Sequence, residues 1–176
     1  KEEYFNLKSQ SQSNKHWLPW LQRQLILNGI LAQTPELPEP YEPNYEKWKS
    51  AFEQFKIDEN TDLIGHSCGA GFLVRFLSEN KIKVGKVALV APFLDPDKDE
   101  IKSSFFDFEI DPEIVSRTKG MLVIYAKDDE DEIQRSVEEI KLNVKAVEVK
   151  ELTKGGHLTF GDMKTEKFPE LLHFLL

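Results

Sequence analysis

The chain has almost no cysteine and no long apolar run. Cys68 is its single cysteine, so no internal disulfide can form, and we expect a cytoplasmic protein. Apolar segments extend over only a handful of residues, too few for a membrane-spanning helix or for the apolar core of a signal peptide. We therefore expect no targeting or spanning segment.

Basic residues are also in deficit. The 23 Lys and Arg residues face 31 Asp and Glu residues, which gives a formal net charge of −8 at pH 7. This charge repels both a phosphate backbone and an anionic bilayer. Nucleic acids and membranes are therefore excluded as expected partners.

The apolar content is sufficient for one core. Apolar residues make up 40% of the 176 residues and include 12 phenylalanines. Two independent cores would leave each half of the chain below the usual domain size. We predict a single domain over residues 1–176.

Short β-branched runs alternate with longer amphipathic stretches, a pattern typical of an α/β fold with a parallel sheet. Strands are expected at 62–64, 86–91 and 121–125, with an edge strand at 146–149. Helices are expected at 45–55, 70–77, 133–140 and 168–175. Another helix should begin after Asn14 as its N-cap, bury Trp17 and Leu21, and end at Gly29.

Two segments lack a regular period. Prolines at 35, 38, 40 and 43 predict an extended surface connector. Residues 91–120 carry several phenylalanines among acidic residues, and we expect them to leave the sheet at its carboxyl edge, where ligands bind in open α/β folds. Their aromatic side chains either anchor this excursion or form a lid on a small pocket for an apolar acyl group.

One motif carries chemistry. Gly65-His66-Ser67-Cys68-Gly69 fits G-x-S-x-G, directly after a predicted strand and directly before a predicted helix. In that context the serine lies on a strained turn, and the flanking glycines keep bulk away from it. Amides at the start of the helix stabilise an oxyanion, with the Cys68 backbone N–H as the expected donor. The alternative is a tight turn with a solvated serine.

A serine nucleophile needs a base and a carboxylate that orients the base. In the order Ser, acid, His, the acid follows a late strand; Asp128, Asp129 and Asp131 are all within reach, and Asp129 is favoured. His157 follows the last predicted strand after two glycines and is the expected base. The remaining histidines lie before the first helix, beside the serine and inside the last helix: His16, His66 and His173.

Each of these residues also has a plainer interpretation. Residues 128–132 alternatively form a solvated acidic cap on the next helix, and His157 alternatively has no role in its loop. His66 is expected to form a pocket wall rather than a second base.

Several segments together carry a family resemblance: His16-Trp17-Leu18-Pro19-Trp20, the connector ending in Tyr45-Glu46-Lys47-Trp48, the glycine–serine motif, Lys127-Asp128-Asp129 and Gly155-Gly156-His157. From about Asn14 onward the chain resembles the small serine hydrolases related to retinoblastoma-binding protein nine. The resemblance implies an α/β-hydrolase-like fold, with a mostly parallel sheet and helices on both faces in a three-layer sandwich. It also implies Ser67 as nucleophile, Asp129 as acid and His157 as base.

The chain departs from that family in places. Members begin with an apolar strand and a glycine-containing loop that supplies a second oxyanion donor, whereas residues 4–10 contain no glycine. We expect this first strand and oxyanion loop to be atypical or truncated. The acid is usually followed by a proline-containing turn, and Glu130 stands here instead, so a shift of the acid by one residue stays open. Ile57 replaces the cysteine of the namesake's retinoblastoma-binding segment, so that partner is not carried over.

These observations predict a serine hydrolase without metal or other cofactor. Its substrate is a small-molecule ester, thioester or amide, cleaved through an acyl-enzyme. The alternative is a non-catalytic binding protein on a hydrolase scaffold, which the altered N-terminal loop favours.

Overall fold

The computed structural model is built around four parallel strands. It describes residues 1–2, 4–6, 8–98 and 104–176. The strands lie side by side in chain order: β1 (Leu63–His66), β2 (Val87–Val90), β3 (Met121–Ala126) and β4 (Glu148–Leu152). Leu63 lies opposite Val87, and Val87 lies opposite Met121. Within the described ranges β1 pairs only with β2, so β1 forms one edge of the sheet and β4 the other.

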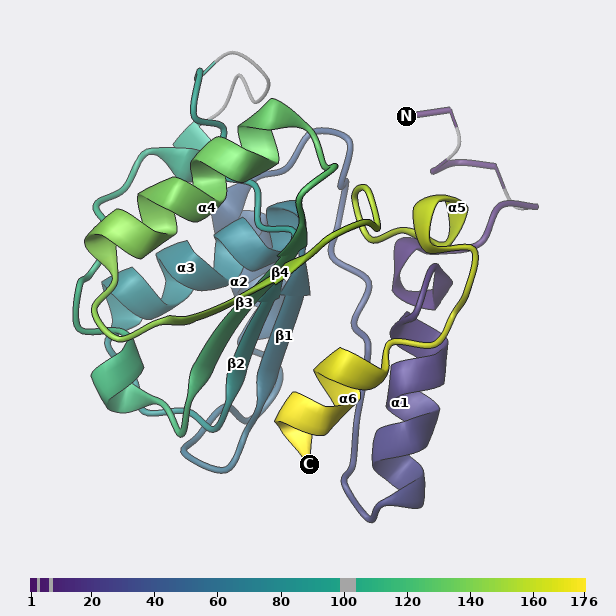
Figure 1. Ribbon diagram of the computed structural model, residues 1–176, viewed down its shortest axis with the longest axis horizontal. Helices are drawn as coiled ribbons and strands as arrows, with labels where there is room; N and C mark the ends of the chain where they lie inside the picture. Colours follow the sequence, from purple (N-terminus) through teal and green to yellow (C-terminus); the bar gives the residue numbers. More distant parts are fainter. Residues whose placement is uncertain (3, 7, 99–103) are drawn as a thin grey trace.

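Helices cover both faces of this sheet (Figure 1). One face carries α1 (Leu18–Leu27) and α6 (Pro169–Leu175). The opposite face carries α2 (Tyr45–Phe52), α3 (Cys68–Asn80) and α4 (Asp131–Asn143). A short helix, α5 (Phe160–Met163), lies between β4 and α6, and 3-10 turns span Gln12–Asn14, Ser104–Phe106 and Val115–Arg117. The arrangement is the three-layer α/β sandwich that the sequence predicts.

The two central strands hold the core. Every residue of β2 and β3 is buried, as expected for parallel strands covered on both faces. β4 differs because its exposed positions carry Glu148, Lys150 and Glu151. The edge position predicted for this strand is therefore correct, and the charged side chains face solvent.

The start of α1 corrects one prediction. The helix begins at Leu18 with Trp17 as its N-cap, and Asn14 belongs to the preceding 3-10 turn instead. His16 has φ +59°, which interrupts a helical path from Asn14. Pro19 lies in the first turn, where its missing N–H costs nothing. Gly29 follows the helix with φ +78°, as predicted.

The excursion after β2 is anchored on the helices. Phe105 is buried, and its ring centroid lies 5.0 Å from that of Trp48 on α2. A Cβ on Gly71 of α3 would lie 2.1 Å from the Phe93 carbonyl oxygen, so that glycine allows the excursion to pack directly on α3. The anchoring alternative is therefore correct for the described part of residues 91–120. Residues 99–103 of this segment lie outside the described residues.

Across the described ranges, no helix is both long enough and apolar enough to cross a membrane.

Candidate active site

Ser67 lies at the turn between β1 and α3. Its backbone has φ +54° and ψ −125°, a conformation that L-residues rarely adopt. A Cβ on Gly65 would lie 2.5 Å from the Gly69 carbonyl oxygen, so the strand and the helix approach too closely for any side chain there. A Cβ on Gly69 would meet nothing within 4 Å. Of the two motif glycines, Gly65 is thus the one required for space, which corrects the expectation that both are.

His157 comes from the loop after β4 and faces the serine. Its Nε2 lies 2.9 Å from the Ser67 Oγ. On the other side of the ring, Nδ1 lies 3.2 Å from each carboxylate oxygen of Asp129, which follows β3. The Asp129 side chain is 1% exposed and that of His157 29% exposed. The three predicted side chains, 62 and 28 residues apart along the chain, therefore meet at the carboxyl edge of the sheet.

The two neighbouring aspartates have different contacts. Asp128 accepts hydrogen bonds through Oδ1 from the backbone N–H groups of Gly155 and Gly156, at 2.8 and 2.9 Å. Asp129 contacts the imidazole. Asp131 lies in the first turn of α4, where its negative charge interacts favourably with the positive end of the helix dipole. The geometry therefore favours Asp129 as the acid, while Asp128 fixes the glycines that precede the base.

Three aromatic side chains tether the loop that carries His157. His66 Nε2 lies 2.8 Å from the His157 carbonyl oxygen. The indole N–H of Trp17 donates to the carbonyl oxygen of Leu158 at 3.1 Å. His16 Nδ1 accepts from the N–H of Phe160 at 3.2 Å. The loop is thus attached to both β1 and the start of α1.

Burial lowers the pKa of both imidazoles, and nearby carboxylates oppose this effect at His157. Burial lowers the pKa of His157, but the Asp129 hydrogen bond and the nearby carboxylates outweigh burial and raise that pKa above 6.5. Burial lowers the pKa of His66 to about 4, and the neighbouring His157 adds to this effect. His66 is therefore neutral near pH 7, and its Nε2 carries the proton that it donates to the carbonyl.

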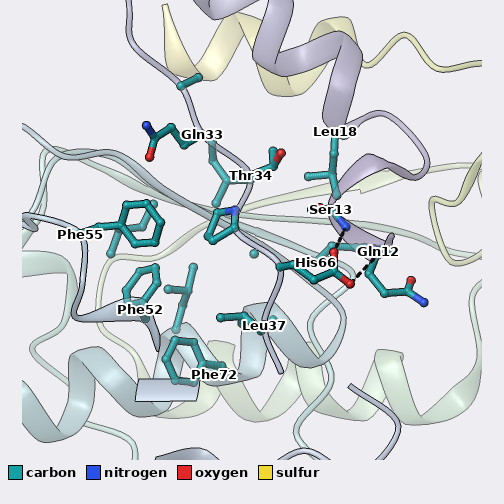
Figure 2. A pocket seen from close by; sticks show the side chains of 18 of the residues that line it. Gln12, Ser13, Leu18, Gln33, Thr34, Leu37, Phe52, Phe55, His66 and Phe72 are labelled. Carbon is teal, nitrogen blue, oxygen red and sulfur yellow. Dashed lines mark hydrogen bonds between the residues drawn. The ribbon is translucent and has the colours of Figure 1, made fainter. Parts of the chain in front are cut away.

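A cavity of about 900 Å³ reaches Ser67 from the β1 side. Figure 2 shows Leu18 on one side of it and Phe52 and Phe72 on the other. Its lining includes residues of α1, β1, α2, α3 and 30–37, and no described residue of 91–120 contributes. The expected small pocket under a lid formed by that excursion is therefore wrong. His66 lines the cavity, as expected of a pocket wall.

Sequence reasoning missed the tethering roles of His16, Trp17 and His66. All three lie in segments that carry the family resemblance, and this resemblance is the feature of the sequence that could have indicated their importance. Their partners are backbone groups of a loop about 90 to 140 residues away, and backbone groups leave no trace in the sequence.

This chain resembles known proteins both in sequence and in fold. Residues 9–175 match the family described as serine hydrolase. The chain belongs to the serine hydrolase family. As a member it is a hydrolase, and the predicted relation to the small hydrolases of the retinoblastoma-binding protein nine type is consistent with this family.

The YdeN protein of Bacillus subtilis (strain 168) is a relative of this hydrolase. The two are 32% identical over 127 residues, which span 67% of this chain and 65% of YdeN. The solved structure of the B. subtilis ydeN gene product superposes with a TM-score of 0.78, at 25% identity over 93% of this chain and 90% of that one. A chain from the structures of LipS and LipT, two metagenome-derived lipolytic enzymes, superposes with a TM-score of 0.62 over 89% and 84% of the chains, at 13% identity. These likenesses confirm the α/β-hydrolase fold of the serine hydrolase.

Proposed function

We propose that this serine hydrolase cleaves a small-molecule ester, thioester or amide through a triad of Ser67, Asp129 and His157. The proposal rests above all on the 2.9 Å between Ser67 Oγ and His157 Nε2, with Asp129 on the opposite side of the imidazole. A serine hydroxyl needs such a base to become nucleophilic near neutral pH.

In the proposed reaction the Ser67 Oγ attacks the substrate carbonyl while His157 Nε2 takes the hydroxyl proton. Asp129 holds the Nδ1–H tautomer and stabilises the imidazolium that forms. The imidazolium then protonates the leaving alcohol, thiol or amine, and an acyl group stays on Ser67. A water molecule, deprotonated by His157, attacks this acyl-enzyme and releases the acid and the free serine.

The proposed oxyanion donor is the backbone N–H of Cys68, the first residue of α3. This helix of 13 residues begins directly after the serine, so its positive end is directed at the reacting carbonyl. A donor of this kind is typically worth about 10²–10³ in kcat. The proposal needs no metal or other cofactor, and it includes a cytoplasmic setting because the fold requires no disulfide.

A fluorophosphonate probe tests the proposal. We expect it to label the wild-type protein, to spare Ser67→Ala and to label His157→Ala far more slowly. A matched control is Ser104→Ala, which changes a serine at a 3-10 turn away from the site. Folded wild-type protein that the probe does not label would contradict the triad and favour the alternative, a binding protein on the same scaffold.

A further inference from the structure

The base loop, residues 155–160, turns sharply on both sides of His157. Gly156 has φ +50° and Leu158 has φ +54°, so a residue in the left-handed region lies before the imidazole and another after it. Leu158 is fully buried, and this conformation is costly for any residue with a side chain. A strained backbone of this kind persists only where surrounding contacts hold it. The position of the imidazole therefore depends on the groups that hold the base loop.

The peptide groups of His157 are held on both sides of its side chain. Its carbonyl oxygen accepts from Nε2 of His66 at 2.8 Å. Its backbone N–H donates to the carboxylate of Asp162 on α5. Two hydrogen bonds at opposite ends of one residue fix the direction in which its side chain leaves the backbone. Asp162 is thus the counterpart of His66, on the other side of the base.

Asp162 belongs to a capping box at the start of α5. Thr159, the N-cap, donates its hydroxyl to Asp162 Oδ2 at 2.7 Å and accepts from the Asp162 N–H at 3.3 Å. The Thr159 N–H donates back to the carboxylate, which completes the reciprocal pattern. The bond from the His157 N–H lies outside this pattern, because His157 precedes the N-cap by two residues. The carboxylate therefore joins the base to α5 as well as capping the helix.

The side chain of Asp162 also packs against the turn before the base. A Cβ on Gly156 would lie 2.8 Å from the Asp162 Cγ, so a side chain at this position would displace the carboxylate. On the other side of the loop, the N–H groups of Gly155 and Gly156 donate to Asp128. α5 itself lies beside the start of α1 (Figure 1). Two carboxylates on separate elements therefore hold the base loop between them.

The charge of Asp162 acts on the imidazole as well. The hydroxyl of Thr159 and the backbone N–H groups of Thr159 and His157 hold the pKa of Asp162 below its usual range, against the effect of burial. The group is therefore ionised near neutral pH. Burial lowers the pKa of His157, the Asp129 hydrogen bond raises it, and the charge of Asp162 adds to that increase. Loss of the carboxylate thus changes both the position and the charge around the base.

We propose that Asp162 is a positioning residue, which keeps the imidazole of His157 within hydrogen-bonding distance of Ser67 by holding the His157 backbone N–H. Asp162 differs in this from Asp129, which contacts the ring itself. The inference rests on the proposed function, in which His157 is the base. Because Asp162 is exposed, its substitution leaves the core intact.

Steady-state kinetics on p-nitrophenyl acetate test the role. We expect Asp162→Ala to lower kcat about 10- to 100-fold with little change in KM, because a displaced base costs rate rather than binding. Asp162→Asn retains an oxygen that accepts from the His157 N–H, so at pH values above the rising limb it should recover most of the lost kcat. The limb of kcat/KM should lie at lower pH in both variants, because both lack the charge.

Glu46→Ala is the matched control, since Glu46 is an exposed acid in the first turn of another helix, α2. It should change neither kcat nor the pH of the limb. A residue that only caps α5 would affect stability and leave both kinetic quantities unchanged. Wild-type kcat and an unmoved limb in Asp162→Ala would therefore overturn the proposal.

Amide hydrogen exchange tests the contact without hydrolysis. We expect the His157 amide to exchange at least about tenfold faster in Asp162→Ala than in the wild-type protein, and to stay close to the wild-type rate in Asp162→Asn and Glu46→Ala. An unchanged rate in Asp162→Ala would overturn the proposal. Folded wild-type protein that a fluorophosphonate does not label would refute the triad and this role together. Labelled wild-type protein with an unaltered kcat in Asp162→Ala would refute the positioning role alone.

Discussion

His66 donates a hydrogen bond from Nε2 to the carbonyl oxygen of His157, over 2.8 Å. The two ring centroids lie 5.0 Å apart. The residue directly before the candidate nucleophile therefore holds the backbone of the candidate base. A pKa of about 4 keeps His66 neutral, so this contact persists wherever the base itself is unprotonated.

Replacing His66 tests this positioning. We expect His66→Phe to lower kcat about 10- to 100-fold with little change in KM, because a displaced base costs rate rather than binding. His66→Gln retains a donor and should recover part of the loss. Steady-state kinetics on p-nitrophenyl acetate measure both, with His173→Gln on α6 as the control. A His66→Phe variant with the kcat of the wild type would show that the tether is dispensable.

Substitutions of Asp128 and Asp129 should lower kcat to different extents. Asp129→Asn removes the carboxylate that orients and charges the imidazole, and we expect kcat to fall about 10³- to 10⁴-fold. Asp128→Asn leaves an oxygen that still accepts from Gly155 and Gly156, so a loss below about tenfold is expected. A larger loss in Asp128→Asn than in Asp129→Asn would move the role of acid by one residue.

The pH profile follows from the shifted pKa of His157. The base acts in its neutral form, and its pKa is raised above 6.5, so kcat/KM should rise with pH along a limb centred above pH 6.5. Asp129→Asn removes the main source of the increase and should move that limb to lower pH in whatever activity remains. A profile that is flat from pH 5 to 9 would indicate hydrolysis without the imidazole.

The two motif glycines should differ in stability. A Cβ at position 65 would lie 2.5 Å from backbone oxygen, so Gly65→Ala should lower the free energy of unfolding by about 1–3 kcal/mol or more. Gly69→Ala meets open space in the first turn of α3 and should change stability by less than about 1 kcal/mol. Urea denaturation measures both variants. Equal losses at the two positions would contradict the close approach of strand and helix at Gly65.

Much of the fold could be predicted from periodicity alone. The strands that contain Val87 and Met121 are short, continuous apolar runs in the sequence. Such runs are typical of parallel strands that are buried on both faces. The N-cap expected for α1, Asn14, lies three residues before the observed N-cap, Trp17, because Asn14 is a good N-cap by residue type. The positive φ of His16 overrides that preference, and such a backbone conformation is a tertiary property.

The candidate site could be predicted in its members but not in its surroundings. The motif and the chain order pointed to Ser67, Asp129 and His157, whose catalytic roles stay predictions, as does the single-domain organisation. The position of the cavity could not be predicted, because the phenylalanines of residues 91–120 are equally compatible with lining a pocket and with anchoring their own segment on the helices. Phe105 packs on Trp48, and only the three-dimensional contacts distinguish these two outcomes.

The two margins of the sheet differ in their capacity for unwanted self-association. β4 is guarded by Glu148, Lys150 and Glu151, and charges of this kind discourage the stacking of molecules into ribbons. β1 has no comparable protection in its own side chains, since Leu63, Ile64 and Gly65 are apolar. Concentrated or heated solutions of this hydrolase should therefore aggregate through the β1 margin, and a lysine placed at Ile64 should suppress that process.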